Sequence, residues 1–344
     1  MMKYLAELTE KKLCGKKVLL RVDFNVSVEN GKILDDYKIK AHKETIDYLI
    51  NCGAIITLLS HITTVESLEP LTDQIQEILG TRSFSLLDNI RKYSGEETND
   101  KELARGFAKS FDIYVNDAFS VSHRNHSSVV AITQFLPSYA GLLLIKEVEN
   151  LDKVVKLPKN GKTLIIGGAK VETKLPIIEN FIDKSENILI GGVVANVFLK
   201  ASGIDIKKSL TDDNLLEKTK EILANPNIVV PEDYIFSNDM ILDAGPKTLD
   251  KFSEIIKKSK TIIWNGPFGR VESEDSSQGT KIIAEAIINS GAFSVIGGGD
   301  TIAFIRKNNM TDKFSYVSTG GGAMLHFLSG KKMPGLEVLN YYDF

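Results

Sequence analysis

The sequence has very few thiols and no long apolar run. Its two cysteines, Cys14 and Cys52, have no spacing typical of a metal site, so we expect reduced, unpaired side chains and a reducing cytoplasm. No apolar stretch approaches the roughly 18 residues that a membrane span needs. The N-terminal segment MMKYLAELTEKK also lacks the apolar core of a secretory signal. These absences predict a cytoplasmic protein with no membrane partner.

Neither sign of charge dominates the chain. It contains 42 Lys and Arg against 45 Asp and Glu, a formal net charge of -3. This balance argues against a nucleic-acid partner bound by overall basic charge, although a local basic patch stays possible. The sequence also lacks internal repeats, low-complexity tracts and any oligomer signature, so a monomer is the default expectation.

What the sequence does contain is an alternation of short apolar runs with longer amphipathic runs, typical of parallel sheets covered on both faces. We expect strands at 17–22, 54–59, 83–87, 112–115, 163–167, 187–192, 227–230, 261–266 and 293–299, and helices at 39–51, 71–79, 100–110 and 140–156. A chain of 344 residues is long for one hydrophobic core. We therefore predict two α/β domains, 1–157 and 158–330, divided at the turn cluster KLPKNGK. The final residues 331–344 are rich in aromatics and leucines, which suggests that they pack on another part of the chain.

Glycines gather where the strands of the second half end, in IIGGAK, ILIGG, NGPFG, VIGGGDT and STGGGA. Glycine lets a phosphate approach bare backbone N–H groups, and the helix that follows adds the positive end of its dipole. One such turn is equally consistent with a tight turn that needs no side chain. Five of them favour a nucleotide site, and the absence of GxxxxGK[ST] excludes a P-loop.

Charged residues accompany these turns. Lys170 and Lys174 lie one helical turn apart, so both can face one phosphate, although solvated surface lysines would show the same spacing. Asp300 follows the glycines of VIGGGDT and suits Mg²⁺ bound to phosphates, or a helix N-cap, or both. Glu272 could accept hydrogen bonds from ribose hydroxyls.

The strand ends of the first half instead carry basic and polar residues. They are Arg21, Asp23, Asn25, His61, Arg91, Asp117, His123, Arg124 and His126. On one side of a sheet they would form a cationic pocket for a small acid bearing carboxylate and phosphate groups. No nucleophile constellation stands out, so the simplest chemistry is direct phosphoryl transfer between two ligands across a cleft.

Nearly end to end, the chain resembles the phosphoglycerate kinase family. The motifs that carry the resemblance are RVDFNV, NGKILDD, LLSH, LLDNIR, YVNDAFSVSHRNHSS, GGAKVETK, WNGPFG, VIGGGDT and STGGGA. The resemblance implies two Rossmann-like three-layer αβα domains joined by a helix, with the C-terminal segment returning to the first domain. It also implies Mg²⁺-dependent exchange between 1,3-bisphosphoglycerate with ADP and 3-phosphoglycerate with ATP.

The resemblance assigns residues by matching position. The substrate contacts it implies are Arg21, Asp23, Phe24, Asn25, Lys38, His61, Thr64, Arg91, His123 and Arg124. The nucleotide contacts are Lys170, Lys174, Gly191, Asn265, Glu272, Gly298, Gly299, Asp300 and Thr301, with Asp300 as the metal ligand. Lys38, Lys174, Gly321 and Gly322 are the residues implied in catalysis, with 320–322 offering a helix N-terminus to the transferred group.

The chain departs from the family at several of these positions. Lys38 stands where an arginine is usual, and it keeps the charge but loses the planar fork. The loop HITTV replaces a pattern like HLGRP, which puts Thr64 in place of another arginine. Val193 replaces a glycine, and GRVE replaces the usual GVFE. These departures leave two alternatives open, a non-catalytic nucleotide-binding relative and a kinase for a different small acid.

Overall fold

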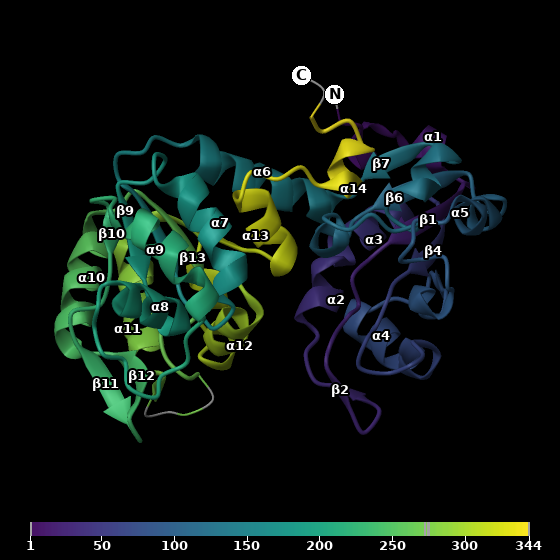
Figure 1. The fold of residues 1–344 in the computed structure, drawn as a ribbon. Helices are drawn as coiled ribbons and strands as arrows, with labels where there is room; N and C mark the ends of the chain where they lie inside the picture. Colours follow the sequence, from purple (N-terminus) through teal and green to yellow (C-terminus); the bar gives the residue numbers. More distant parts are fainter. Residues whose placement is uncertain (1, 272, 274–275, 343–344) are drawn as a thin grey trace. The chain divides into compact units, whose positions relative to one another are not determined.

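The computed structural model describes residues 2–271, 273 and 276–342, which form two compact units. The first unit contains residues 1–149 and 332–344, and the second contains 150–331. Helix α6 (Leu142–Lys156) begins in the first unit and ends in the second (Figure 1). Among the described residues, no helix is both long enough and apolar enough to cross a membrane.

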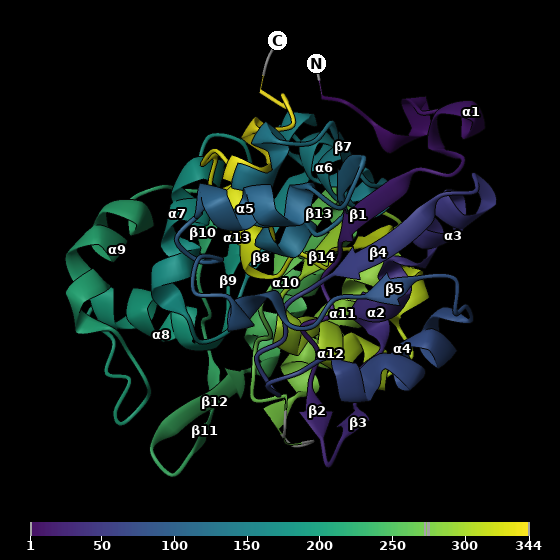
Figure 2. The same cartoon turned by 90° about the vertical axis from the view of Figure 1, so that its right-hand side faces the viewer.

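A five-stranded parallel sheet forms the centre of the first unit. Its strands are β1 (Lys17–Arg21), β4 (Ile55–Leu59), β5 (Ser85–Leu86), β6 (Ile113–Asn116) and β7 (Ser138–Ala140), in the order β5-β4-β1-β6-β7. Figure 2 shows β1, β4 and β5 side by side. The strand order reverses direction at β1, and in open parallel sheets the crevice beyond such a point is where ligands bind.

Helices cover both faces of this sheet. They are α1 (Glu10–Leu13), α2 (Tyr37–Ala41), α3 (Lys43–Asn51), α4 (Thr72–Leu79), α5 (Lys101–Ala108) and α14 (Pro334–Glu337). One face buries Leu20 and Leu58 against α2, α3 and α4. The other face buries Leu19 and Tyr114 with residues of α5. Successive side chains of each strand point to opposite faces of the sheet, so the core of this unit consists of two apolar layers, one on each face.

The C-terminal segment belongs to this first unit. The backbone N–H of Gly335 in α14 donates to the carbonyl oxygen of Ser122 at 2.8 Å. A Cβ at Gly335 would lie 2.7 Å from a methyl group of Val129, so the backbone approaches closely here.

A six-stranded sheet forms the centre of the second unit. Its strands are β8 (Lys162–Ile166), β9 (Asn187–Ile190), β10 (Ile228–Val229), β13 (Thr261–Asn265), β14 (Phe293–Gly297) and β15 (Tyr316–Val317), in the order β10-β9-β8-β13-β14-β15, all parallel. The order again reverses direction at the first strand, β8, as in dinucleotide-binding folds.

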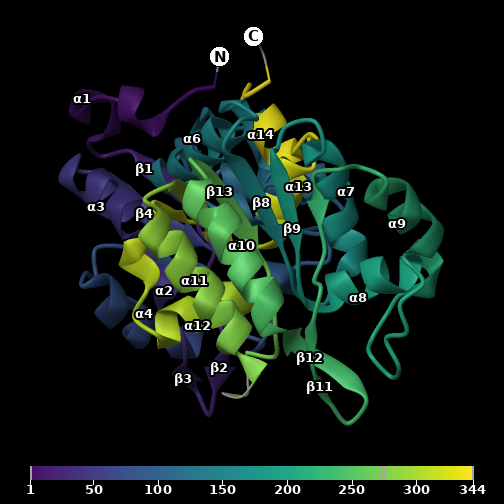
Figure 3. The same ribbon diagram turned by 90° about the vertical axis from the view of Figure 1, so that its left-hand side faces the viewer.

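The helices of the second unit lie on both faces of its sheet. They are α7 (Val171–Phe181), α8 (Gly192–Ala201), α9 (Leu216–Leu223), α10 (Pro246–Lys258), α11 (Gln278–Ser290), α12 (Gly299–Lys307) and α13 (Gly322–Leu328). Helices α10, α11 and α12 lie over one face in Figure 3, where Ile262, Trp264 and Ile296 are buried among their side chains. The predicted fold class, α/β with parallel sheets and helices on both sides, is confirmed.

The structure corrects several predicted elements. The helix expected at 39–51 is two helices, α2 and α3, which are divided at His42. The antiparallel hairpins β2 (Val28–Glu29) with β3 (Lys32–Ile33) and β11 (Tyr234–Ser237) with β12 (Met240–Ala244) were not predicted. The short strands β7 and β15 were also missed, because two or three residues carry too little periodicity to be recognised.

Candidate active site

Arg21 ends β1 at the carboxyl edge of the first unit's sheet and is almost fully buried. Its Nε donates to Ser128 Oγ at 3.0 Å, and one terminal nitrogen lies 3.3 Å from His61 Nδ1. Another terminal nitrogen donates to the carbonyl oxygen of Val22. Arg21 is therefore a rigid cation fixed beneath the loops that follow the strands.

Asp23 lies two residues beyond the strand and is 4 % exposed. Its carboxylate accepts from Lys38 Nζ at 2.8 Å and from Ser120 Oγ. Burial by itself raises the pKa of Asp23, but the Lys38 ammonium, His61 and these hydrogen bonds together hold that pKa well below its usual range. Asp23 is an anion that already has a cationic partner in Lys38.

His61 is the neutral member of the cluster. Burial and the neighbouring Arg21 lower the pKa of His61 to about 3, and Arg91 and Arg124 act in the same direction. Burial and Arg91 likewise lower the pKa of Arg124 from its ordinary value. The predicted residues Arg21, Asp23, His61, Arg91 and Arg124 are thus close enough to affect one another's charge. Cations outnumber anions here, which suits an anionic ligand.

The other predicted acceptor residues have more varied positions. Asn25 Oδ1 accepts from the backbone N–H and the hydroxyl of Thr63, at 2.9 and 2.8 Å. The Thr64 hydroxyl donates to the carbonyl oxygen of Val26 at 2.8 Å, so it joins the loop after β4 to the segment after β1. Phe24 is fully buried, which leaves only its backbone available to a ligand. His123 and Arg124 are partly buried in the turn that follows β6.

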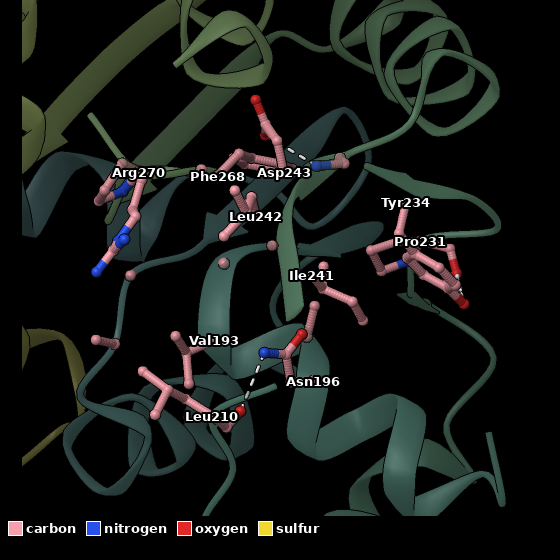
Figure 4. A pocket seen from close by; sticks show the side chains of 18 of the residues that line it. Val193, Asn196, Leu210, Pro231, Tyr234, Ile241, Leu242, Asp243, Phe268 and Arg270 are labelled. Carbon is pink, nitrogen blue, oxygen red and sulfur yellow. Dashed lines mark hydrogen bonds between the residues drawn. The ribbon is translucent and has the colours of Figure 1, made fainter. Parts of the chain in front are cut away.

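The second unit contains a cavity of about 250 Å³ beyond the ends of its strands (Figure 4). Its floor is backbone from the glycine turns, including Gly168, Gly191 and Gly192. Its apolar wall is Val193, Leu210, Pro231, Tyr234, Met240, Ile241, Leu242 and Phe268. An apolar wall beside glycine turns suits a nucleotide base with its phosphates.

Two of the glycine turns interlock with each other. A Cβ at Gly266 would lie 2.1 Å from the carbonyl oxygen of Gly167, and Gly266 has a φ of +96°. The Gly168 N–H donates to the carbonyl oxygen of Pro267 at 2.7 Å. At Gly191 a Cβ would meet the Phe268 ring at 2.7 Å. These glycines are therefore required for backbone packing, whatever ligand they bind.

Three glycines in the turns after β14 and β15 differ, because they face open space. No heavy atom lies within 4 Å of a Cβ placed on Gly299, Gly321 or Gly322. Gly298 has a φ of +102° and lies next to the side chain of Asn265. These are the turns where bare backbone is exposed for a phosphate.

Lys174 projects from the first turns of α7 and is 7 % exposed. Its Nζ donates to Asn265 Oδ1 at the end of β13. Burial lowers the pKa of Lys174 to about 8, Lys170 contributes in the same direction, and Asp300 opposes them. Among the described residues nothing accepts a hydrogen bond from Asn265 Nδ2, which is buried. The structure therefore brings Lys170, Lys174, Asn265 and Asp300 together.

Asp300 and Thr301 begin helix α12 after the glycines of β14. Asp300 is exposed and lines the cavity, whereas Thr301 is buried and its hydroxyl accepts from the Gly266 N–H at 3.0 Å. Glu272, the predicted ribose contact, lies outside the described residues. No group of three or more His, Cys, Asp or Glu side chains within the described ranges could hold a metal by itself.

Sequence reasoning missed the apolar wall of the cavity and the buried residues Asp243 and His42. Part of this wall is the hairpin of residues 234–244, whose turn residues Asn238 and Asp239 both have positive φ. In the sequence, an adjacent Asn and Asp are only a weak turn signal. Asp243 was not predicted as a site residue, and burial raises the pKa of its carboxyl to about 6. The contact of His42 with Asp117 at 2.6 Å was also missed, because 75 residues separate the two.

Comparison with known proteins agrees with this geometry. The family model described as phosphoglycerate kinase matches residues 8–331. A curated phosphoglycerate kinase from Francisella philomiragia is 39% identical, over 95% of this chain and 96% of its own length. The structure of phosphoglycerate kinase from Coxiella burnetii superposes with a TM-score of 0.88 at 34% identity, covering 99% of this chain and 100% of that one. The crystal structure of the enzyme from Pyrococcus horikoshii has a TM-score of 0.90 at 31% identity, with both chains covered completely. The chain therefore belongs to the phosphoglycerate kinase family of phosphotransferases.

Proposed function

We propose that this chain transfers a phosphoryl group reversibly between 1,3-bisphosphoglycerate and ADP, giving 3-phosphoglycerate and ATP, as a step of glycolysis. The observation that carries the proposal is the position of Lys174. It is a buried ammonium group held by Asn265, in the same site as Asp300, next to a cavity with a glycine floor. A cation in that position suits the charge of a transferring phosphoryl group.

The nucleotide would bind in the second unit. The base and sugar would occupy the cavity against Leu242 and Phe268, and the phosphates would lie over Lys170, Lys174, Gly298 and Gly299. Gly321 and Gly322 face open space at the start of α13 and would offer backbone N–H groups to the group in transfer. Lys174 would remain with the phosphoryl group as its charge develops.

The acceptor would bind in the first unit. Arg21, Arg91 and Arg124 supply the positive charge, with Asn25 and His123 as further polar contacts. Neutral His61 can donate a hydrogen bond without adding charge. Lys38 is the proposed contact of the phosphoryl group on this side, and its bond to Asp23 keeps it ordered before the ligand binds.

Mg²⁺ fits this donor set. A single exposed carboxylate, Asp300, lies beside glycine backbone and near Lys174, and Mg²⁺ usually takes one or two carboxylates with the remaining ligands from phosphate and water. When bound there, the ion would neutralise charge on the nucleotide phosphates. We further propose that the chain acts as a cytoplasmic monomer with small-molecule partners and without nucleic acid.

Two alternatives follow from Lys38 and Thr64. For the first, a non-catalytic nucleotide-binding relative, retention of both Lys174 and Asp300 counts against a role as a pure scaffold, which would need neither residue. A kinase for a different small acid would exploit the changed loop at Thr64, whose hydroxyl donates to the carbonyl oxygen of Val26 in the segment after β1. Neither is favoured, because relatives over the full chain are named phosphoglycerate kinase.

The test is a coupled assay of the purified chain with Mg-ATP and 3-phosphoglycerate. We expect turnover that rises in Lys38→Arg, because the planar fork of arginine binds phosphate at two points. The increase in kcat/KM should be roughly tenfold, as for one added charge-assisted hydrogen bond. Lys92→Arg, a matched exchange at an exposed lysine paired with Asp88, should change nothing. Absence of turnover in both the parent and Lys38→Arg would instead support the non-catalytic alternative.

A further inference from the structure

His42 is a buried titratable residue that the proposed mechanism does not use. It lies between α2 and α3 and is 1 % exposed. Its Nε2 is 2.9 Å from the backbone nitrogen of Asp23, and its Nδ1 is 2.6 Å from Asp117 Oδ2. Both ring nitrogens therefore have partners within the first unit.

The partners determine the tautomer of the ring. A backbone nitrogen can only donate, so Nε2 of His42 must accept from the N–H of Asp23 and carries no proton. The proton of the neutral ring is then on Nδ1, which donates to Asp117. Since Nε2 is already occupied by a backbone N–H, His42 does not act as a general base.

The same ring is linked to the acceptor site on one side and to α6 on the other. Asp117 Oδ1 accepts from the hydroxyl of Thr45 and from the backbone N–H of Leu143, both at 2.9 Å. The carboxylate therefore caps the first turn of α6 while its other oxygen orients the imidazole. Asp117 is fully buried, so this arrangement has little freedom to shift.

Asp23 is consequently held at two points, by Lys38 of α2 and by His42 at the C-terminal end of that helix. Lys38 binds its carboxylate at 2.8 Å, and His42, four residues further along, accepts its backbone N–H at 2.9 Å. The ring of Phe24, the next residue, packs edge-on against His42 with 5.8 Å between ring centres. The backbone from Asp23 to Asn25 is thereby fixed relative to the helix that carries Lys38.

We propose that His42 is a positioning residue for the acceptor site, acting through the backbone of Asp23. The Nδ1-protonated tautomer of His42 accepts a hydrogen bond from the Asp23 N–H at Nε2. Asp117 stabilises that tautomer by accepting from Nδ1. This inference rests on the acceptor site proposed above. It assigns the buried Asp117–His42 pair to substrate positioning, beyond the contacts that the family resemblance supplies.

Two substitutions at position 42 separate this role from simple packing. In His42→Asn, the short amide can still donate to Asp117 but leaves the Asp23 N–H without an acceptor. In His42→Gln, the longer side chain can place its oxygen near the former Nε2 and accept that N–H. Each variant loses one buried hydrogen bond, so we expect similar decreases in Tm for both.

The kinetic readout is KM for 3-phosphoglycerate compared with KM for ATP. We expect His42→Asn to raise KM for 3-phosphoglycerate roughly tenfold, as for one unsatisfied buried N–H, with KM for ATP unchanged. His42→Gln should recover most of that increase. If the parent turns over but both variants change KM for 3-phosphoglycerate equally, or change both KM values together, the inference is wrong. Absence of turnover in the parent would overturn the proposed function instead.

A second measurement does not depend on any variant folding. Nitrogen-15 spectra of the unaltered chain at neutral pH should show His42 with an unprotonated Nε2 and a protonated Nδ1. A protonated Nε2 would remove the hydrogen bond to Asp23 and contradict the inference whatever the kinetics show.

Discussion

At the scale of single residues, Lys170, which precedes α7, and Lys174 within it have different environments although they are only four residues apart. Lys170 is exposed, whereas Lys174 is buried against Asn265. The cost of burying an ammonium group is visible in the lowered pKa of Lys174, about 8. Lys174 should therefore give nucleotide binding a pH dependence near pH 8.

The direction of this pH dependence follows from the protonated form of Lys174, because only the ammonium ion attracts phosphate. Below pH 8 Lys174 is protonated and attracts the nucleotide, and above pH 8 the charge is progressively lost. We expect the affinity for Mg-ATP to fall by up to about tenfold per pH unit above this value, as for loss of one proton. Calorimetric titration with Mg-ATP at several pH values between 6.5 and 9.5 measures this change in affinity.

Arginine provides the matched control for this prediction. Lys174→Arg stays charged over the whole range, so its affinity should not decrease with pH, whereas Lys170→Arg should retain the decrease of the parent. A decrease that persists in Lys174→Arg would assign the pH dependence to another group.

The sequence predicted which charged residues lie at strand ends, because motif and position indicate that directly. It did not predict their partners. The bond between Lys38 and Asp23 and the contact between His42 and Asp117 depend on how α2 lies against β1 and β6, which the local pattern does not encode. Likewise, the pKa of Asp243 depends on its place in the fold, because burial raises it while a hydrogen bond from the N–H of Gly279, distant in the chain, lowers it.

At the scale of secondary-structure elements, the glycine turns divide into two kinds. Those at Gly167 and Gly266 allow the ends of β8 and β13 to interlock, whereas Gly299 at the start of α12 faces open space. The five turns look alike in the sequence, and we interpreted them together as evidence of a nucleotide site. Only the folded structure distinguishes the glycines that pack against other backbone from those whose backbone is exposed to a ligand.

Alanine substitutions should separate the two kinds. Gly266→Ala places a methyl group 2.1 Å from the Gly167 carbonyl oxygen at a φ of +96°, so it should lower the free energy of unfolding. We expect a loss of roughly 2–5 kcal/mol from clash and strain together. Gly299→Ala meets no atom and should change stability by about 0.5 kcal/mol at most.

The opposite ranking applies to ligand binding. Gly299→Ala should weaken Mg-ATP binding roughly tenfold, because the phosphates need bare backbone at this turn. Denaturant unfolding and calorimetry on the same two variants measure both quantities. A stable Gly266→Ala protein, or undiminished ATP binding in Gly299→Ala, would contradict the division.

At the scale of the whole molecule, each unit has its own proposed ligand. The cation cluster lies in residues 1–149, and the cavity lies in 150–331. The alternation of strands and helices predicted this two-part α/β architecture, because it is a long-range repetition of a strong local signal. The hairpin β11–β12 and the division of 39–51 at His42 were missed, because a two-residue turn and a single helix break are weak signals.

Hydrogen exchange tests this assignment of ligands to units. Mg-ATP should slow exchange at the glycine turns after β8, β13 and β14, and 3-phosphoglycerate should slow it after β1, β4 and β6. A ligand at 100 times its Kd stabilises the folded protein by about 2.7 kcal/mol, which is enough to slow hydrogen exchange detectably. Protection by 3-phosphoglycerate confined to residues 150–331 would refute the assignment.

The return of residues 332–342 to the first unit has a consequence for synthesis of the chain. The second unit is continuous in sequence and is complete once residue 331 has left the ribosome. The first unit, although it starts earlier, receives α14 and the bond from Gly335 to Ser122 only after the second unit has been synthesised. The sheet of the first unit therefore lacks α14 while the second unit is synthesised and folds. The order of synthesis and the order of completion are reversed in this protein.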